Sequence, residues 1–173
     1  ASPGDEEATY AATKRGGTED ITIEAVKNDD AGAVRRIPVK LSRAAKRTLH
    51  KFVFDFLRAN AAIYDAKALF HADHGNLGST ALAAASLTTR RQAMLKQTEA
   101  GSSEILGIPA KYLIVPVDLD KTAYDLISGP RNSDFNPTGA DFTRTLQMEQ
   151  IVVTYWTDTN NWFMIDDKMM KQW

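Results

Sequence analysis

Residues 38–60 read PVKLSRAAKRTLHKFVFDFLRAN, and they contain the strongest structural signal in the chain. Apolar and small side chains recur there at steps of three and four, which is the spacing of one face of an α-helix. Pro38 suits the first turn of such a helix, where its missing N–H costs no hydrogen bond. We therefore predict a long amphipathic helix to about Asn60, whose apolar stripe consists of Leu41, Ala45, Thr48, Phe52, Phe56, Ala59 and, just beyond, Ile63.

The opposite side of this predicted helix is cationic. Between Ala31 and Phe54 the chain has seven Lys or Arg residues and no Asp or Glu. A solvated helix face usually mixes both signs, because opposite charges four residues apart attract each other. A face of one sign gains no such pairs, so we expect it to meet an anion or an acidic partner surface. The row of cations consists of Arg36, Lys40, Arg43, Arg47 and Lys51.

The residues before the helix predict a segment that cannot stabilise itself. Gly16-Gly17 is a turn signal, and Ile21 and Ile23 alternate with polar residues as they do in strands. A β-hairpin or an extended loop is therefore expected between Tyr10 and Lys27. Its tip is basic and its arms carry little apolar surface, and an isolated two-stranded ribbon is marginal in water. Either the segment stays loose or another chain completes it.

The second half of the chain predicts a mixed α+β domain, because helical and strand-like patterns both occur in it. The short apolar run at 111–116 is typical of a buried strand, and the residues at 130–145 are rich in Asn, Asp, Pro and Gly. The predicted elements are a helix over 86–98, a strand over 111–116, a helix over 118–127, a loop over 130–145, and strands over 148–155 and 162–165 that pair with each other.

The composition and motifs exclude several classes of protein. The chain has no cysteine, which excludes disulfides and thiolate metal sites and fits a reducing compartment such as the bacterial cytoplasm. It contains no Gly-x-Ser-x-Gly elbow, no phosphate-binding glycine loop and no run of eighteen apolar residues. With 43% hydrophobic residues and a formal net charge of −1, it is typical of a globular protein. We expect no cofactor and no membrane partner.

His71, Asp73 and His74 form the one pattern that suggests an enzyme. Two imidazoles and a carboxylate within four residues could begin the metal site of a metal-dependent hydrolase. The remaining histidine, His50, lies in the predicted long helix, and no spacing identifies a further ligand. The alternative is that these side chains hold their loop by hydrogen bonds to its backbone. A third hypothesis is a DNA-binding module that uses the cationic row to hold phosphates without sequence specificity.

Four segments, taken in order, carry a resemblance to a known family. They are Tyr10–Asp30 with its Lys14-Arg15-Gly16-Gly17, Arg43–Phe54, Phe70–Leu77 and Leu106–Pro116. Together they resemble the major capsid proteins of tailed bacteriophages of the Hong Kong 97 type. The nearest branch is that of the Mu-like major head subunits, in which the capsid region is often fused behind a prohead protease. The resemblance covers nearly the whole chain from Tyr10 on.

This resemblance implies an α+β, Hong Kong 97-like capsid fold. Residues 1–27 would form an N-terminal segment and an extended loop that reaches over a neighbouring subunit. Residues 28–66 would contain the spine helix of the peripheral domain, and residues 67–173 mainly the axial domain. The C-terminal part of the peripheral domain would be truncated, so the chain is expected to be a fragment. The loop residues expected at the subunit interface are Tyr10, Lys14, Arg15, Glu19, Ile21 and Ile23.

The resemblance also implies a structural function and no enzymatic one. The chain would assemble with itself into pentamers and hexamers of an icosahedral phage or prophage head that encloses double-stranded DNA without sequence specificity. A scaffold or a prohead protease would be further partners. The protein would be located in the virion, after assembly in the bacterial cytoplasm.

Overall fold

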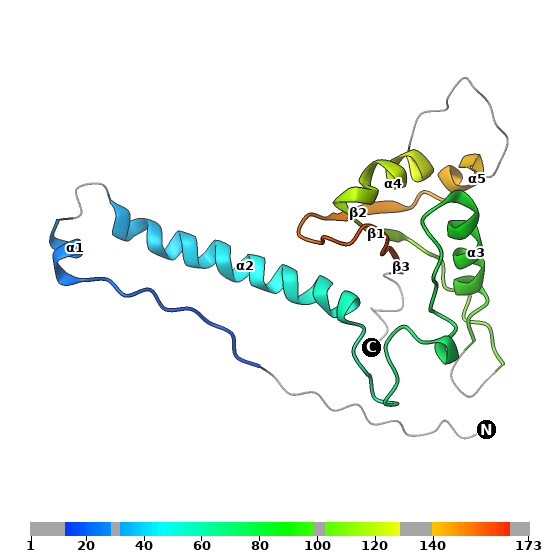
Figure 1. The fold of residues 1–173 in the computed structure, drawn as a ribbon, viewed down its shortest axis with the longest axis horizontal. Coiled ribbons are helices and arrows are strands. Elements are labelled where there is room, and N and C mark those ends of the chain that lie inside the picture. The colour runs from blue at the N-terminus through cyan, green and yellow to red at the C-terminus, as the bar shows by residue number, and fades with distance from the viewer. Residues whose placement is uncertain (1–12, 29–31, 99–102, 129–139, 167–173) are drawn as a thin grey trace. The chain divides into compact units, whose positions relative to one another are not determined.

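A computed structural model describes residues 13–28, 32–98, 103–128 and 140–166 (Figure 1). The chain divides into two units, Ala1–Leu69 and Phe70–Trp173, each with its own internal contacts. Within the described residues, no helix combines the length and the apolar character that crossing a membrane requires.

Unit 1 is dominated by the predicted long helix, α2 (Ala33–Ala59). The helix begins after Gly32, which has a left-handed backbone at φ 63°, and it ends at Asn60, which is also left-handed. The prediction that Pro38 lies in the first turn is wrong, because α2 begins at Ala33 and Pro38 lies inside the helix. Its ring nitrogen can donate no hydrogen bond to the carbonyl of Val34, yet the helix continues through this position.

The segment before α2 was predicted as a β-hairpin or an extended loop, and its described residues form no hairpin, whereas the extended-loop alternative is not contradicted. Residues 13–22 form neither helix nor strand, and a short helix, α1 (Ile23–Lys27), follows them. The hydroxyl of Thr22 accepts a hydrogen bond from the backbone N–H of Ala25 at 3.2 Å, and this cap starts the helix. The strand-like alternation at Ile21 and Ile23 is therefore overridden by a local capping signal. Tyr10 lies outside the described residues.

Unit 2 is built on a three-stranded sheet of β1 (Tyr112–Pro116), β2 (Glu149–Val153) and β3 (Phe163–Ile165). The strand order is β2-β1-β3. β2 runs parallel to β1, with Tyr112 opposite Glu149, and β3 runs antiparallel to β1, with Tyr112 opposite Ile165. All three predicted strands are confirmed. The predicted pairing of the last two with each other is wrong, because both pair with β1.

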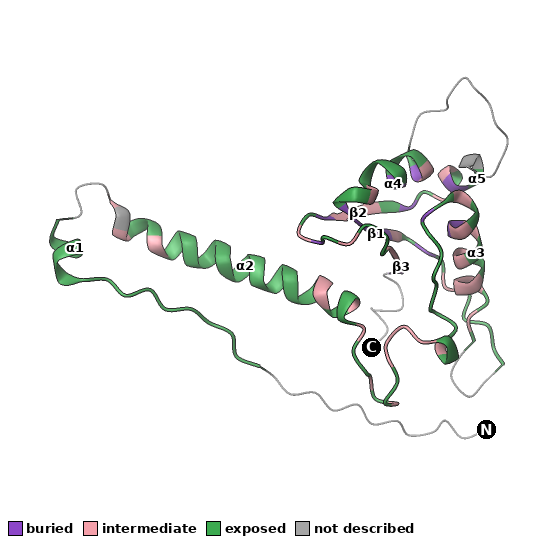
Figure 2. Ribbon diagram, in the orientation of Figure 1, coloured by how far each residue is buried: buried purple, intermediate pink, exposed green. Residues whose placement is uncertain are grey.

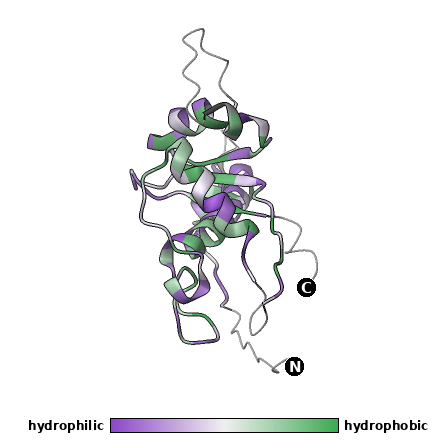
Figure 3. Cartoon of the chain, turned by 90° about the vertical axis from the view of Figure 1, so that its right-hand side faces the viewer, coloured by the Kyte–Doolittle hydropathy of each residue, from purple (hydrophilic) through white to green (hydrophobic). Residues whose placement is uncertain are grey.

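Helices cover this sheet. The predicted helix over 86–98 is confirmed as α3 (Ala84–Leu95), and the helix predicted from Asp118 begins as a 3-10 turn, η2 (Val117–Leu119), that continues into α4 (Asp120–Ile127). α5 (Ala140–Thr145) occupies part of the predicted loop, whose residues 130–139 lie outside the described residues. The helices of unit 2 carry both apolar and polar residues (Figure 3), as expected of helices that cover a sheet on one side.

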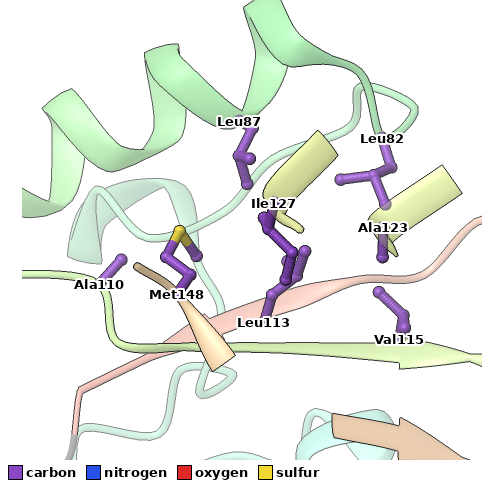
Figure 4. Close-up of a cluster of buried hydrophobic side chains, with 8 residues drawn as sticks. All are labelled: Leu82, Leu87, Ala110, Leu113, Val115, Ala123, Ile127 and Met148. Carbon is purple, nitrogen blue, oxygen red and sulfur yellow. The ribbon is translucent and has the colours of Figure 1, made fainter. Parts of the chain in front are cut away.

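The core of unit 2 lies between the sheet and these helices (Figure 4). Leu113 and Val115 of β1 are fully buried there, against Leu87 of α3 and against Ala123 and Ile127 of α4. Leu82, Ala110 and Met148 complete the cluster. Because side chains alternate along a strand, Ile114 faces the other side of the sheet, and it is buried as well.

A second, aromatic layer covers that other side. Phe163, the cross-strand neighbour of Ile114, has its ring centroid 5.5 Å from that of Trp156 and 5.2 Å from that of Phe70. Trp156 is buried. β1 is thus enclosed on both faces, which explains why its sequence is an uninterrupted apolar run rather than an alternating one.

Gln147 gives a first prediction about the stability of unit 2. It follows α5 with φ 50°, the left-handed conformation that glycine adopts most readily after a helix. Gln147→Gly should therefore raise the free energy of unfolding by about 0.5–1 kcal/mol in urea denaturation. The same substitution at the exposed Gln92, inside α3, should lower it by about 1 kcal/mol. Losses of equal size at both positions would contradict the prediction.

Candidate subunit interface

α2 buries none of its described side chains (Figure 2). A helix in a globular protein normally hides an apolar stripe against its own core. Over its 27 residues α2 instead exposes large apolar side chains, with Leu49 66% and Phe56 50% exposed. Water-exposed apolar surface of this extent usually marks a contact with another molecule. The described part of the chain therefore leaves the apolar side of α2 uncovered.

The predicted apolar stripe exists, but it is wider than predicted. Its members within α2 from Leu41 to Ala59 are all exposed, and Ile63, just beyond the helix, is half-buried. Val39, Leu49 and Val53 are exposed apolar residues that the stripe did not include. The signal that could have found Leu49 and Val53 is the same helical spacing, because Leu49 lies four residues after Ala45 and Val53 lies four residues after Leu49.

The segment that leads into α2 is also exposed. None of residues 13–28 is buried, and the predicted interface residues Lys14, Arg15, Glu19, Ile21 and Ile23 are all on the surface. The guanidinium of Arg15 lies 5.2 Å from the ring centroid of Phe52, a cation–π contact between this segment and α2 of the same chain.

The cationic row is exposed over its whole length. Arg36, Lys40, Arg43, Arg47 and Lys51 all present their side chains to solvent. Within the part of the chain that the structure describes, the first four have no carboxylate at ion-pair distance. Asp55 is the one acidic residue of α2. The row therefore keeps the unbalanced positive charge that the sequence predicted.

His71, Asp73 and His74 surround a 3-10 turn, η1 (Ala72–His74). Nδ1 of His71 accepts a hydrogen bond from the backbone N–H of Asp73 at 3.2 Å, and the backbone N–H of His71 donates to Oδ1 of Asn76 at 3.0 Å. These hydrogen bonds join residues of the same loop, as expected for side chains that stabilise the conformation of the loop. His50 lies in α2, where its ring packs against Phe54. Across the described ranges, no three His, Asp or Glu side chains are grouped as metal ligands would be.

Comparison with known proteins adds the decisive observation. A model of the family described as "Phage capsid protein" matches residues 5–172, which is almost the entire chain. The chain belongs to the phage capsid protein family. No curated protein and no solved structure matches it significantly. Membership of the phage capsid family gives the protein a structural role in the virion capsid, where it assembles with other capsid subunits.

A phage capsid protein must carry surfaces that are exposed in the single chain and covered in the shell. In unit 1, α2 and residues 13–28 have that property: their apolar and charged side chains are exposed together. In unit 2, by contrast, the apolar residues of β1 are enclosed by the chain itself. We therefore take α2 and residues 13–28 as the candidate subunit interface of this capsid protein.

Proposed function

We propose that this chain is a shell subunit of the Hong Kong 97 type, which assembles as pentamers and hexamers into an icosahedral head around double-stranded DNA. α2 is then the spine helix of the peripheral domain, and unit 2 is mainly the axial domain. The observation that carries the proposal is the exposed apolar stripe of α2. A subunit that folded for itself alone would have no reason to leave this stripe in water.

The two units differ in how much of their apolar surface they leave in water. Covering apolar surface contributes about 25 cal/mol per Å², so a half-exposed leucine or phenylalanine gains about 1–1.5 kcal/mol when a partner covers it. α2 carries several such side chains along one side, among them Leu49, Phe52, Val53 and Phe56. Covering these side chains by another subunit would favour association. In unit 2 the apolar side chains of β1 are already covered by the same chain, so they contribute to folding and not to association.

Closed rings also require two unlike surfaces on each subunit, because each copy must bind the next one head to tail. Unit 1 offers such a pair. Residues 13–22 form an irregular segment without helix or strand, whereas α2 is a long regular helix. If residues 13–22 of one copy bind α2 of the next copy, the same contact can repeat around a ring of five or six subunits. Within this proposal the Mu-like head subunits are the nearest branch, and a scaffold or prohead protease is a further partner.

Electron microscopy and light scattering of the purified chain test this function. We expect concentration-dependent particles, with five- and six-fold rings or curved sheets in the images. The matched control is the chain that carries Leu49→Gln and Phe56→Gln on the apolar side of α2. It should form no such particles under the same conditions. A wild-type chain that remains monomeric at every concentration and salt would contradict the proposal.

A further inference from the structure

Two sets of opposite charge in unit 1 face solvent without meeting. One is the cationic row of α2, of which Arg36, Lys40, Arg43 and Arg47 have no carboxylate partner among the described residues. The other set is acidic and lies in the segment before the helix. It consists of Glu19, Asp20 and Glu24, which are exposed and, in the described ranges, have no cationic partner either.

The chain cannot easily pair these sets within itself. Arg15 anchors the segment to Phe52, and at 100° per residue Phe52 lies roughly 120–180° around the helix from the four cations. This contact of the segment with α2 of the same chain therefore lies on the apolar side of the helix, away from the four cations. The cationic side remains free for another molecule.

The segment itself also needs a surface to lie on. α1 has five residues, none of them buried, and its apolar side chains Ile23 and Val26 are 74% and 56% exposed. An isolated helix this short is not stable in water. The capping bond from Thr22 starts the helix but buries nothing. Glu24 lies in this helix and Glu19 and Asp20 lie just before it, so all three belong to a segment that an outside contact would complete.

We propose that Glu19, Asp20 and Glu24 of one copy dock on Arg36, Lys40, Arg43 and Arg47 of the next copy. The inference rests on the proposed function and names which residues direct the contact between subunits. One contact of this kind satisfies both unpaired sets, and it is head to tail, as a closed ring needs. DNA phosphates would satisfy the cationic row alone and leave the three carboxylates uncovered. Opposite charges across an interface chiefly speed encounter and fix which surfaces meet.

Charge reversal in two separate chains tests the pairing by analytical ultracentrifugation. The acid-reversed chain carries E19K, D20K and E24K, and the base-reversed chain carries R36E, R43E and R47E. Each alone places like charges in the contact and should associate at least about tenfold more weakly than wild type. An equimolar mixture restores opposite charges in every contact between unlike chains, so its association should return to within about threefold of wild type. Wild-type association should weaken as salt rises.

The control chain carries E104K, D118K and E149K, which reverses three exposed acidic residues of unit 2 and changes the net charge by the same amount as in the acid-reversed chain. It should associate like wild type. All six reversed residues in unit 1 are exposed, so circular dichroism should show unchanged helix content. If a reversed chain nevertheless loses helix, the chain with all six reversals gives a second measurement, and it should associate like wild type.

The outcomes separate this pairing from the proposed function. A wild-type chain that never associates overturns both. A wild-type chain that associates, together with reversed chains that associate equally well or a mixture that is no tighter than its components, overturns the pairing alone. Loss of DNA binding in the base-reversed chain, without restored association in the mixture, would assign the cationic row to nucleic acid and overturn the pairing as well.

Discussion

The chain that carries Leu49→Gln and Phe56→Gln is expected to stay folded and to associate at least about 30-fold more weakly than wild type. The two side chains lie seven residues apart on one side of α2 and are 66% and 50% exposed. Covering each by a partner is worth about 1 kcal/mol or more, and a loss of about 2 kcal/mol corresponds to this factor. Glutamine is a good helix former, so the helix itself should be preserved. Sedimentation equilibrium measures the association, and circular dichroism measures the helix content.

The matched control makes the same two changes in unit 2, at Leu77 and Phe142. These side chains are exposed to a similar degree, 48% and 47%, but neither lies on α2. We expect this control to associate within about threefold of wild type, because surface substitutions outside a contact have small effects. If both double variants weaken association equally, general surface hydrophobicity drives association and α2 has no special role.

The chain with Leu113→Ala is expected to lose about 2–5 kcal/mol of unfolding free energy. Leu113 is fully buried in the central strand, in the cluster formed with Leu87, Ala123 and Ile127. Truncation removes apolar contacts and leaves a cavity between strand and helices that the surrounding side chains cannot fill completely. Because small domains are stable by only about 5–15 kcal/mol, this loss should shift the urea midpoint markedly.

Leu77→Ala serves as the control for this stability measurement. Its side chain is about half exposed and lies in the same unit, so its truncation should change the unfolding free energy by no more than about 0.5 kcal/mol. Similar losses at Leu113 and Leu77 would show that β1 is not the centre of a cooperative core.

The elements that the sequence predicted well are those whose signal lies within a continuous stretch of the chain. The steps of three and four between Leu41 and Ala59 predicted α2, and the apolar run before Pro116 predicted β1. The first pattern reports the helical repeat, and the second reports a strand that is apolar on both faces. The hairpin alternative between Tyr10 and Lys27 depended on only two alternating residues, Ile21 and Ile23. A helix begins at Ile23 instead, and at its start the backbone N–H of Ala25 donates a hydrogen bond to the hydroxyl of Thr22.

The pairing of strands could not be predicted from the same patterns. β2 and β3 are close in sequence, and a short polar turn between two strands usually joins a hairpin. β1, however, is apolar on both faces, and in the folded unit it lies between them. Periodicity identifies which residues form a strand and says nothing about which neighbour completes its hydrogen bonds.

The candidate interface was predicted in part for a physical reason. The unbalanced charge of the cationic row can be counted from the sequence, and the structure leaves that row exposed as expected. The exposure of Leu49, Val53 and Phe56 could not be predicted, because an amphipathic pattern does not say whether the apolar side is covered by the same chain or by another. Only three-dimensional structure distinguishes these cases.

The strand order of unit 2 also has a consequence for how the protein is made. The central strand, β1, is synthesised first, but its parallel partner begins at Glu149 and its antiparallel partner at Phe163. The ribosome must therefore synthesise more than thirty residues after β1 before β2 or β3 can pair with it. Pairing between strands that are far apart in the sequence is slow, and an apolar strand that has no partner yet is prone to aggregate. We therefore expect the yield of subunits to fall when translation between β1 and β3 is slowed, because the unpaired strand then stays exposed for longer.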